Sequence, residues 1–145
     1  MKGGNSKMSK KINKKFIKLF NELDNSCCEK LGVKAGGVTE YINRLESARF
    51  APNRDEVLGN LNKYRNLRNI LIHEHKAMKK NKVLVKADLK WMKKFKKALK
   101  RKKDPISAYL RKARKYARRR KFKKFALVLL VLALIGVAVY AFMPK

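Results

Sequence analysis

Hydrophobic residues recur at helical spacing through the first hundred residues of the chain. Between residues 10 and 23 the apolar side chains repeat every three or four positions, with lysines between them, which predicts an amphipathic helix. Three glycines between residues 32 and 37 interrupt this pattern. Thr39 is then expected to cap a short second helix.

Further capping residues divide the rest of this region. Asn53 or Asp55 can cap a third helix, whose apolar set extends to Ile72, and Asp88 is expected to cap a fourth. Asp104 followed by proline predicts the N-cap and first position of a fifth helix, which is strongly basic. The chain shows no internal repeat and no convincing strand pattern.

The fold class predicted from these patterns is all-α. We expect a flexible basic arm at residues 1–9, a small cytoplasmic helical bundle at residues 10–103 and a long basic juxtamembrane helix at residues 104–124. With 145 residues, the chain has room for one compact domain.

An uncharged stretch at residues 125–143 follows the basic helix. As a helix it would cover about 28 Å, close to the roughly 30 Å hydrocarbon thickness of a bilayer. The sequence therefore predicts a single C-terminal transmembrane helix, or tail anchor. Lysines and arginines cluster before it, which places the N-terminal domain in the cytoplasm and the C-terminus across the membrane.

The charge is extreme, because 40 Lys and Arg stand against 10 Asp and Glu, for a formal net charge of +30. Residues 76–124 carry 24 of these cations against Asp88 and Asp104. Such a chain favours an anionic partner, either anionic lipid of a membrane or nucleic acid, and composition does not choose between the two. The residues expected to bind lipid headgroups or nucleic acid are Lys93, Lys94, Lys96, Lys97, Arg118, Arg119, Arg120, Lys121, Lys123 and Lys124.

Cofactor chemistry is not indicated. The two cysteines, Cys27 and Cys28, are adjacent and do not form a disulfide framework. No zinc-ligand spacing and no glycine-rich phosphate loop occurs in the sequence. We therefore expect neither a metal nor a cofactor.

The third helix carries the one constellation with possible catalytic chemistry. On a helical projection Arg68 falls within the apolar stripe, where an unpaired guanidinium is costly. Asn69 and His73 lie on the largely polar opposite face. A charged residue in an apolar stripe breaks a local rule, and such exceptions often mark functional positions.

The segment from Arg68 through Asn69 to His73 resembles the Arg-x(4–6)-His signature of HEPN domains, in the form with a polar residue after the arginine. The resemblance covers roughly residues 12–110. HEPN domains are small all-α bundles that usually dimerise, and many are metal-independent ribonucleases of toxin, defence or RNA-processing systems. The resemblance implies a catalytic site of Arg68, Asn69 and His73, doubled across a homodimer.

Two functions follow as hypotheses. The first is a membrane-anchored, HEPN-like protein that cleaves cytoplasmic RNA, with His73 as the base and Arg68 as the cation that stabilises the phosphorane. The second is a non-enzymatic, membrane-tethered adaptor or nucleic-acid-binding module that works through its lysines and arginines. The cognate protein partner and the RNA substrate are not specified by the sequence.

Overall fold

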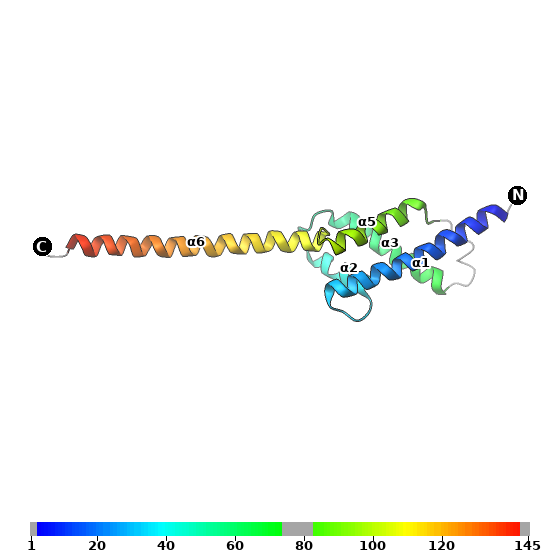
Figure 1. Cartoon of the computed structure of the whole chain (residues 1–145), viewed down its shortest axis with the longest axis horizontal. Helices are drawn as coiled ribbons and strands as arrows, with labels where there is room; N and C mark the ends of the chain where they lie inside the picture. The colour runs from blue at the N-terminus through cyan, green and yellow to red at the C-terminus, as the bar shows by residue number, and fades with distance from the viewer. Residues whose placement is uncertain (1–2, 74–82, 143–145) are drawn as a thin grey trace. The chain divides into compact units, whose positions relative to one another are not determined.

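The computed structural model describes residues 3–73 and 83–142, with side chains described from residue 11 to residue 138 within those ranges. These residues form helices α1 (Gly3–Leu31), α2 (Gly37–Ser47), α3 (Arg54–His73), α5 (Lys86–Lys100) and α6 (Pro105–Phe142), as Figure 1 shows. The described residues contain no strand, so the predicted all-α class is confirmed. Helix α1 begins at Gly3, earlier than the predicted start at residue 10.

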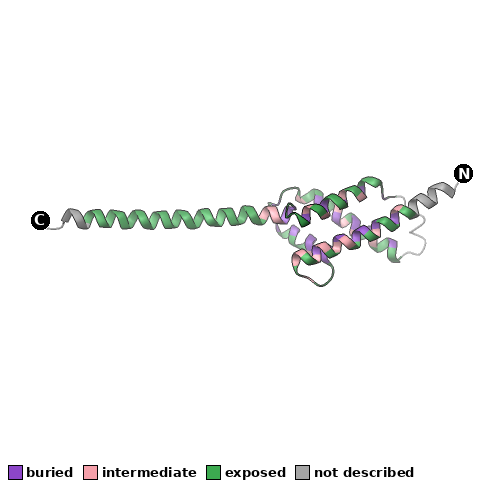
Figure 2. Cartoon of the chain, in the orientation of Figure 1, coloured by how far each residue is buried: buried purple, intermediate pink, exposed green. Residues whose placement is uncertain are grey.

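The chain divides into two units, one ending at Tyr109 and the other beginning at Leu110. The first is a small bundle in which α1 packs against α2, α3 and α5. In the second, every residue of α6 whose side chain is described is exposed, which Figure 2 shows as continuous green.

The core of the bundle collects apolar side chains from each of its helices. Phe16 of α1 packs against Tyr64 of α3 with ring centroids 6.0 Å apart, and Tyr41 of α2 packs edge-on against Phe95 of α5 at 5.5 Å. These aromatic pairs join four helices around one centre and add to the free energy gained by removing the rings from water.

Helices α1 and α5 run parallel and in register. The side chain of Glu22 in α1 pairs with Lys96 in α5, and Lys30 pairs with Asp104 just beyond the end of α5. Both pairs are separated by 74 residues in sequence. The same offset at two points two turns apart fixes the alignment of these helices along their length.

Asp104 is buried at the start of α6 with three kinds of donor around it. Lys30 lies 2.6 Å from one carboxylate oxygen, while the Tyr41 hydroxyl donates to the other at 2.8 Å and the Ser107 backbone N–H at 3.2 Å. The last of these bonds is the N-cap interaction predicted from Asp104 and Pro105, so that prediction is confirmed. Burial raises the pKa of Asp104, but the hydrogen bonds from Lys30, Ser107 and Tyr41 outweigh it and lower the pKa.

Asp88 is surrounded in the same way at the start of α5. Its carboxylate accepts from Lys63 at 2.8 Å, from the Tyr64 hydroxyl at 3.1 Å and from the Val85 backbone N–H at 2.8 Å. The N-cap residue of α5 is Val85, so the expected cap at Asp88 is wrong. Asp88 occupies the third helical position, and its carboxylate reaches back to accept the Val85 N–H. Burial opposes ionisation, but the bonds from Lys63, Val85 and Tyr64 lower the pKa of this carboxyl group.

The start of α2 differs from the prediction. The helix begins at Gly37, so Thr39 lies inside its first turn and the expected cap at Thr39 is wrong. The carboxylate of Asp24 in α1 accepts the Val38 N–H at 2.7 Å instead. The two backbones approach closely at this contact. A Cβ atom at Gly37 would lie only 2.3 Å from the Asp24 carbonyl oxygen, so the position requires glycine.

The predicted membrane segment is not supported. Within the described part of the chain, no helix combines the length and the apolar character that crossing a bilayer needs. The single-pass, tail-anchored topology at residues 125–143 and the cytoplasmic placement derived from it are therefore wrong, and residue 143 lies outside the described residues.

Candidate nucleic-acid interface

A continuous stripe of lysines runs along α1. Lys11, Lys15 and Lys18 recur with Glu22 at four-, three- and four-residue spacing, so all four lie within about 40° of one line on the helix surface. The three lysines are exposed. The Cβ atoms of helical neighbours at this spacing lie about 5–6 Å apart, so the like charges of these lysines repel one another.

A matching stripe runs along α5. Lys93, Lys96 and Lys100 lie within about 60° of one another on the helix, and Lys97 lies beside them. Lys96 forms a 2.5 Å ion pair with Glu22, which joins this stripe to the one on α1. We call Lys11, Lys15, Lys18, Lys93, Lys97 and Lys100 the basic face of the bundle.

The charges of both stripes act on Glu22. The hydrogen bond and charge of Lys96 lower the pKa of this carboxyl group, and the charges of Lys18 and Lys100 lower it further. Glu22 is thus the point where three lysines from two helices converge. Since one carboxylate cannot balance them all, the face carries a large positive excess.

Not every predicted lysine belongs to this face. Lys94 lies about 160° around α5 from Lys96, on the flank where Trp91 donates a hydrogen bond to Glu56 of α3 at 3.4 Å. Lys93 and Lys94 are adjacent and both exposed, but they lie about 100° apart around the helix. Of the four predicted α5 residues, Lys93 and Lys97 lie on the basic face, Lys96 lies at its junction with α1, and Lys94 lies elsewhere.

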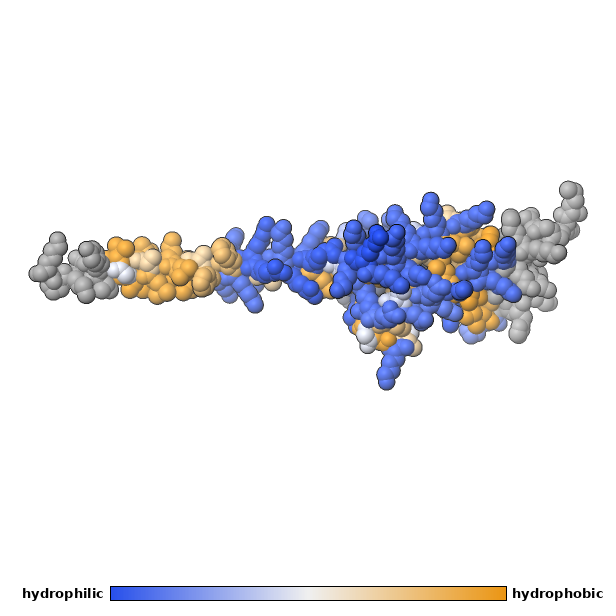
Figure 3. Space-filling model, viewed as in Figure 1, coloured by the Kyte–Doolittle hydropathy of each residue, from blue (hydrophilic) through white to orange (hydrophobic). Residues whose placement is uncertain are grey.

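The second unit has its own concentration of cations. We call residues 110–124 of α6 the basic segment. It carries ten Lys and Arg and no acid, and all of its side chains are exposed. In Figure 3 this hydrophilic stretch precedes the orange apolar part of α6. The predicted residues Arg118, Arg119, Arg120, Lys121, Lys123 and Lys124 all belong to it.

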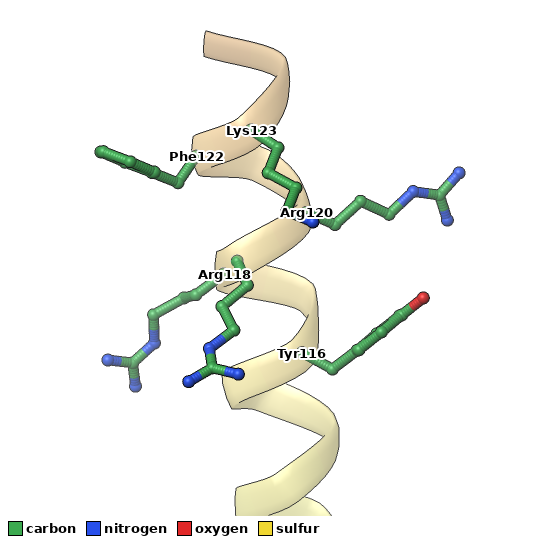
Figure 4. A pocket seen from close by; sticks show the side chains of 6 residues that line it. Tyr116, Arg118, Arg120, Phe122 and Lys123 are labelled. Atoms are coloured by element: carbon green, nitrogen blue, oxygen red, sulfur yellow. The ribbon is translucent and has the colours of Figure 1, made fainter. Parts of the chain in front are cut away.

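A shallow hollow on this segment contains two aromatic rings. It is lined by Tyr116, Arg118, Arg119, Arg120, Phe122 and Lys123. All six residues come from one helix, and in Figure 4 their side chains extend outward in different directions. The hollow is therefore an open surface suited to a flexible polyanion, and it does not enclose a small molecule.

The predicted catalytic residues occupy the last two turns of α3. Arg68 donates to the Asn69 side-chain oxygen at 3.3 Å, and its Nε is buried without a hydrogen-bond partner among the described residues. His73, the final residue of the helix, is exposed. No hydrogen bond within the described part of the chain joins His73 to Arg68 or Asn69, and the two ends of the motif point about 140° apart. Their catalytic role stays a prediction, as does the homodimer that would double the site.

Metal ligands do not assemble in the described parts of the chain. Among those residues, no group of three or more His, Cys, Asp or Glu side chains lies close enough to hold an ion. Cys27 and Cys28 are free thiols, and burial raises the pKa of Cys27 to about 12. Cys27 is therefore a neutral core residue at physiological pH.

Comparison with known proteins identifies the family of the chain. Residues 14–127 match a family of unknown function, DUF6548, and the chain belongs to that family. No curated protein and no solved structure matches it.

The family match corrects the HEPN resemblance. The matching family is not a HEPN family, so the assignment of the chain to HEPN domains is wrong. The motif that suggested it needs only an arginine and a histidine at a suitable distance. In a chain with 40 Lys and Arg such a pair arises readily by chance.

The lysines of α1 that belong to the basic face were not among the binding residues predicted from the sequence. The four-three-four spacing of Lys11, Lys15, Lys18 and Glu22 is visible there, but it indicates only the solvent side of an amphipathic helix. The parallel alignment of α1 with α5 is what makes these lysines part of one surface.

Proposed function

We propose that this protein binds nucleic acid, RNA in particular, through phosphate contacts that do not read base sequence. The observation that carries the proposal is the parallel pairing of lysine stripes on α1 and α5, joined at Glu22. A second polycationic surface, the basic segment of α6, supports it independently. Each unit of the chain thus presents its own cationic surface.

The chemistry of these surfaces suits a phosphate backbone. An ammonium group is a compact point charge on a flexible stem, and an arginine guanidinium can bind two phosphate oxygens at once. Lysines at one-turn spacing repel one another until a polyanion neutralises them. Binding then releases the counterions condensed on the nucleic acid, which supplies most of the free energy of non-specific association.

Binding without sequence readout is favoured by the composition of the basic face. Its members are all lysines, which bind phosphate oxygens as point charges, and contacts to phosphate carry no sequence information. Lysines along one shallow surface position a strand and carry no base information. We therefore expect similar affinities for RNAs of different sequence and the same length.

The test compares two pairs of substitutions with equal loss of charge. Lys93→Gln with Lys100→Gln removes two cations from the basic face, whereas Lys94→Gln with Lys34→Gln removes two exposed cations outside it. Each phosphate contact is worth roughly fivefold in affinity at 0.1 M salt through counterion release. The first pair should therefore weaken RNA binding by roughly tenfold or more, and the second pair by much less.

Two results would overturn the proposal. One is equal weakening by both pairs, since only net charge would then matter and no surface would be defined. The other is binding of an acidic polypeptide, such as polyglutamate, as tightly as RNA of equal charge. That second result would favour the alternative of an adaptor for an acidic protein.

A further inference from the structure

The basic segment holds two aromatic side chains that phosphate binding does not explain. Tyr116 is 72 % exposed and Phe122 is 71 % exposed, and cations surround both of them in sequence. Phosphate contacts need only the charges. Large rings held in water contribute nothing to those contacts, and on a helix outside the core they do not pack the bundle either.

Aromatic rings between cations suit the unpaired bases of a single strand. Every base has a flat π-face that can stack on tyrosine or phenylalanine, whatever its sequence. In a duplex these faces are covered by neighbouring base pairs, so a ring outside the helix cannot reach them. Exposed aromatics among phosphate-binding cations therefore distinguish single strands from duplexes.

The spacing of the rings also favours an unstacked strand. Six positions separate Tyr116 from Phe122, which corresponds to about 9 Å along the helix axis and about 120° around it. Figure 4 shows the two rings projecting from opposite sides of α6. Neighbouring bases in a regular stacked strand follow at about 3.4 Å, so two neighbouring bases reach both rings only if they are splayed apart.

The residues between the rings complete the arrangement. Arg118, Arg119 and Arg120 follow Tyr116 within about one turn, so a strand passing from one ring to the other meets guanidinium groups. These groups can bind phosphate oxygens or lie flat against a base. Stacking and charge thus alternate along the path that the strand would take.

We propose that the basic segment of α6 binds single-stranded RNA in preference to duplex RNA, with bases stacked on Tyr116 and Phe122. This inference rests on the proposed binding of nucleic acid and adds the form of nucleic acid that is recognised. The preference comes from the rings, while the cations bind both forms.

The experiment measures the affinity of the full chain for a single-stranded RNA and for a duplex RNA of the same length. Tyr116→Leu and Phe122→Leu keep an apolar side chain of good helix propensity and remove the ring. Phe50→Leu is the matched control, because Phe50 is 84 % exposed but lies in the loop between α2 and α3. Since both α6 positions lie outside the core, the substitutions leave the bundle folded, which circular dichroism checks.

Each α6 substitution should weaken single-strand binding by about tenfold and duplex binding by less than about twofold. Tyr116→Trp should keep the single-strand affinity, with its fluorescence quenched on stacking. Equal affinity for both forms, with no effect of either leucine, would overturn the single-strand preference and leave the phosphate-binding proposal standing. Failure to bind either RNA would overturn both.

Discussion

The hydroxyl group of Tyr41 donates a 2.8 Å hydrogen bond to the carboxylate of Asp104, and neither side chain reaches solvent. Lys30 supplies the balancing charge from α1. The contact joins α2 to the start of α6, while Asp88 makes the equivalent set of bonds to Lys63 and Tyr64 of α3. Two buried aspartates thus stabilise the bundle at two points. Each accepts hydrogen bonds from one tyrosine, one lysine and one backbone N–H.

Replacing Asp104 with asparagine should destabilise the bundle. The amide can still accept from Tyr41, but Lys30, whose side chain is only 17 % exposed, loses its anionic partner. We expect a loss of about 2–4 kcal/mol in the free energy of unfolding, measured by urea denaturation. Asp55→Asn is the matched control, since this carboxylate is 92 % exposed beside Arg54 and should cost less than about 0.5 kcal/mol. Similar losses for both variants would contradict the role of the buried network.

Acid should unfold the bundle through the same carboxylates. The folded state lowers the pKa values of Asp88 and Asp104 below the ordinary value of 3.8, so protons bind more readily to the unfolded chain. Their stabilisation is therefore fully present above about pH 4 and is lost as the pH falls through the lowered values. The unfolding free energy should decline over this acid range, and less steeply in Asp104→Asn. An identical pH dependence in the variant would exclude Asp104 as a source.

The contact between α1 and α2 should not tolerate a side chain at Gly37. A Cβ atom there would lie 2.3 Å from the Asp24 carbonyl oxygen and 2.4 Å from the Cys28 backbone nitrogen, both of them main-chain atoms that cannot rotate away. Gly37→Ala should cost about 3 kcal/mol in thermal or urea unfolding.

Gly59→Ala is the same chemical change as Gly37→Ala, but we expect it to raise the free energy of unfolding. Nothing lies within 4 Å of a Cβ atom at Gly59, which sits in the interior of α3. Alanine should therefore stabilise the protein by about 0.5–1 kcal/mol. Destabilisation by both substitutions would show that the effect is not the close approach at Gly37.

The variant His73→Ala distinguishes the ribonuclease hypothesis from RNA binding without cleavage. If binding is the whole activity, the chain and His73→Ala should retain RNA with equal affinity and leave it intact over hours, as judged on a denaturing gel. His73 is exposed at the end of α3, so the substitution does not disturb the core. Cleavage by the unaltered chain that is lost in His73→Ala would instead support the Arg68 and His73 site.

Local signals in the sequence predicted much of the bundle. The pair Asp104 and Pro105 predicted the start of α6, and the hydrogen bond from the Ser107 N–H to Asp104 confirms it. This prediction was possible because capping depends on residues only a few positions apart. Arg68 was predicted within the apolar stripe, and its buried Nε agrees. The cap of α2 could not be predicted in this way, since Asp24 provides it from another helix.

The candidate site was predicted only in part, for a similar reason. The cations of residues 111–124 are visible as a run in the sequence, but the difference between Lys93 and Lys94 depends on which flank of α5 meets α1. Glu22, the junction of the two lysine stripes, lies 74 residues from its partner Lys96. Only the packing of parallel helices reveals a contact over that separation.

The salt dependence of RNA affinity tests the central claim most directly. For a single strand, the logarithm of the association constant should fall linearly with the logarithm of salt concentration, with a slope of about −0.7 per phosphate contact. Lys93→Gln with Lys100→Gln should reduce the magnitude of this slope by about 1.4, while Lys94→Gln with Lys34→Gln leaves it close to that of the unaltered chain. A slope near zero, or an equal reduction by both pairs, would contradict phosphate binding at the basic face.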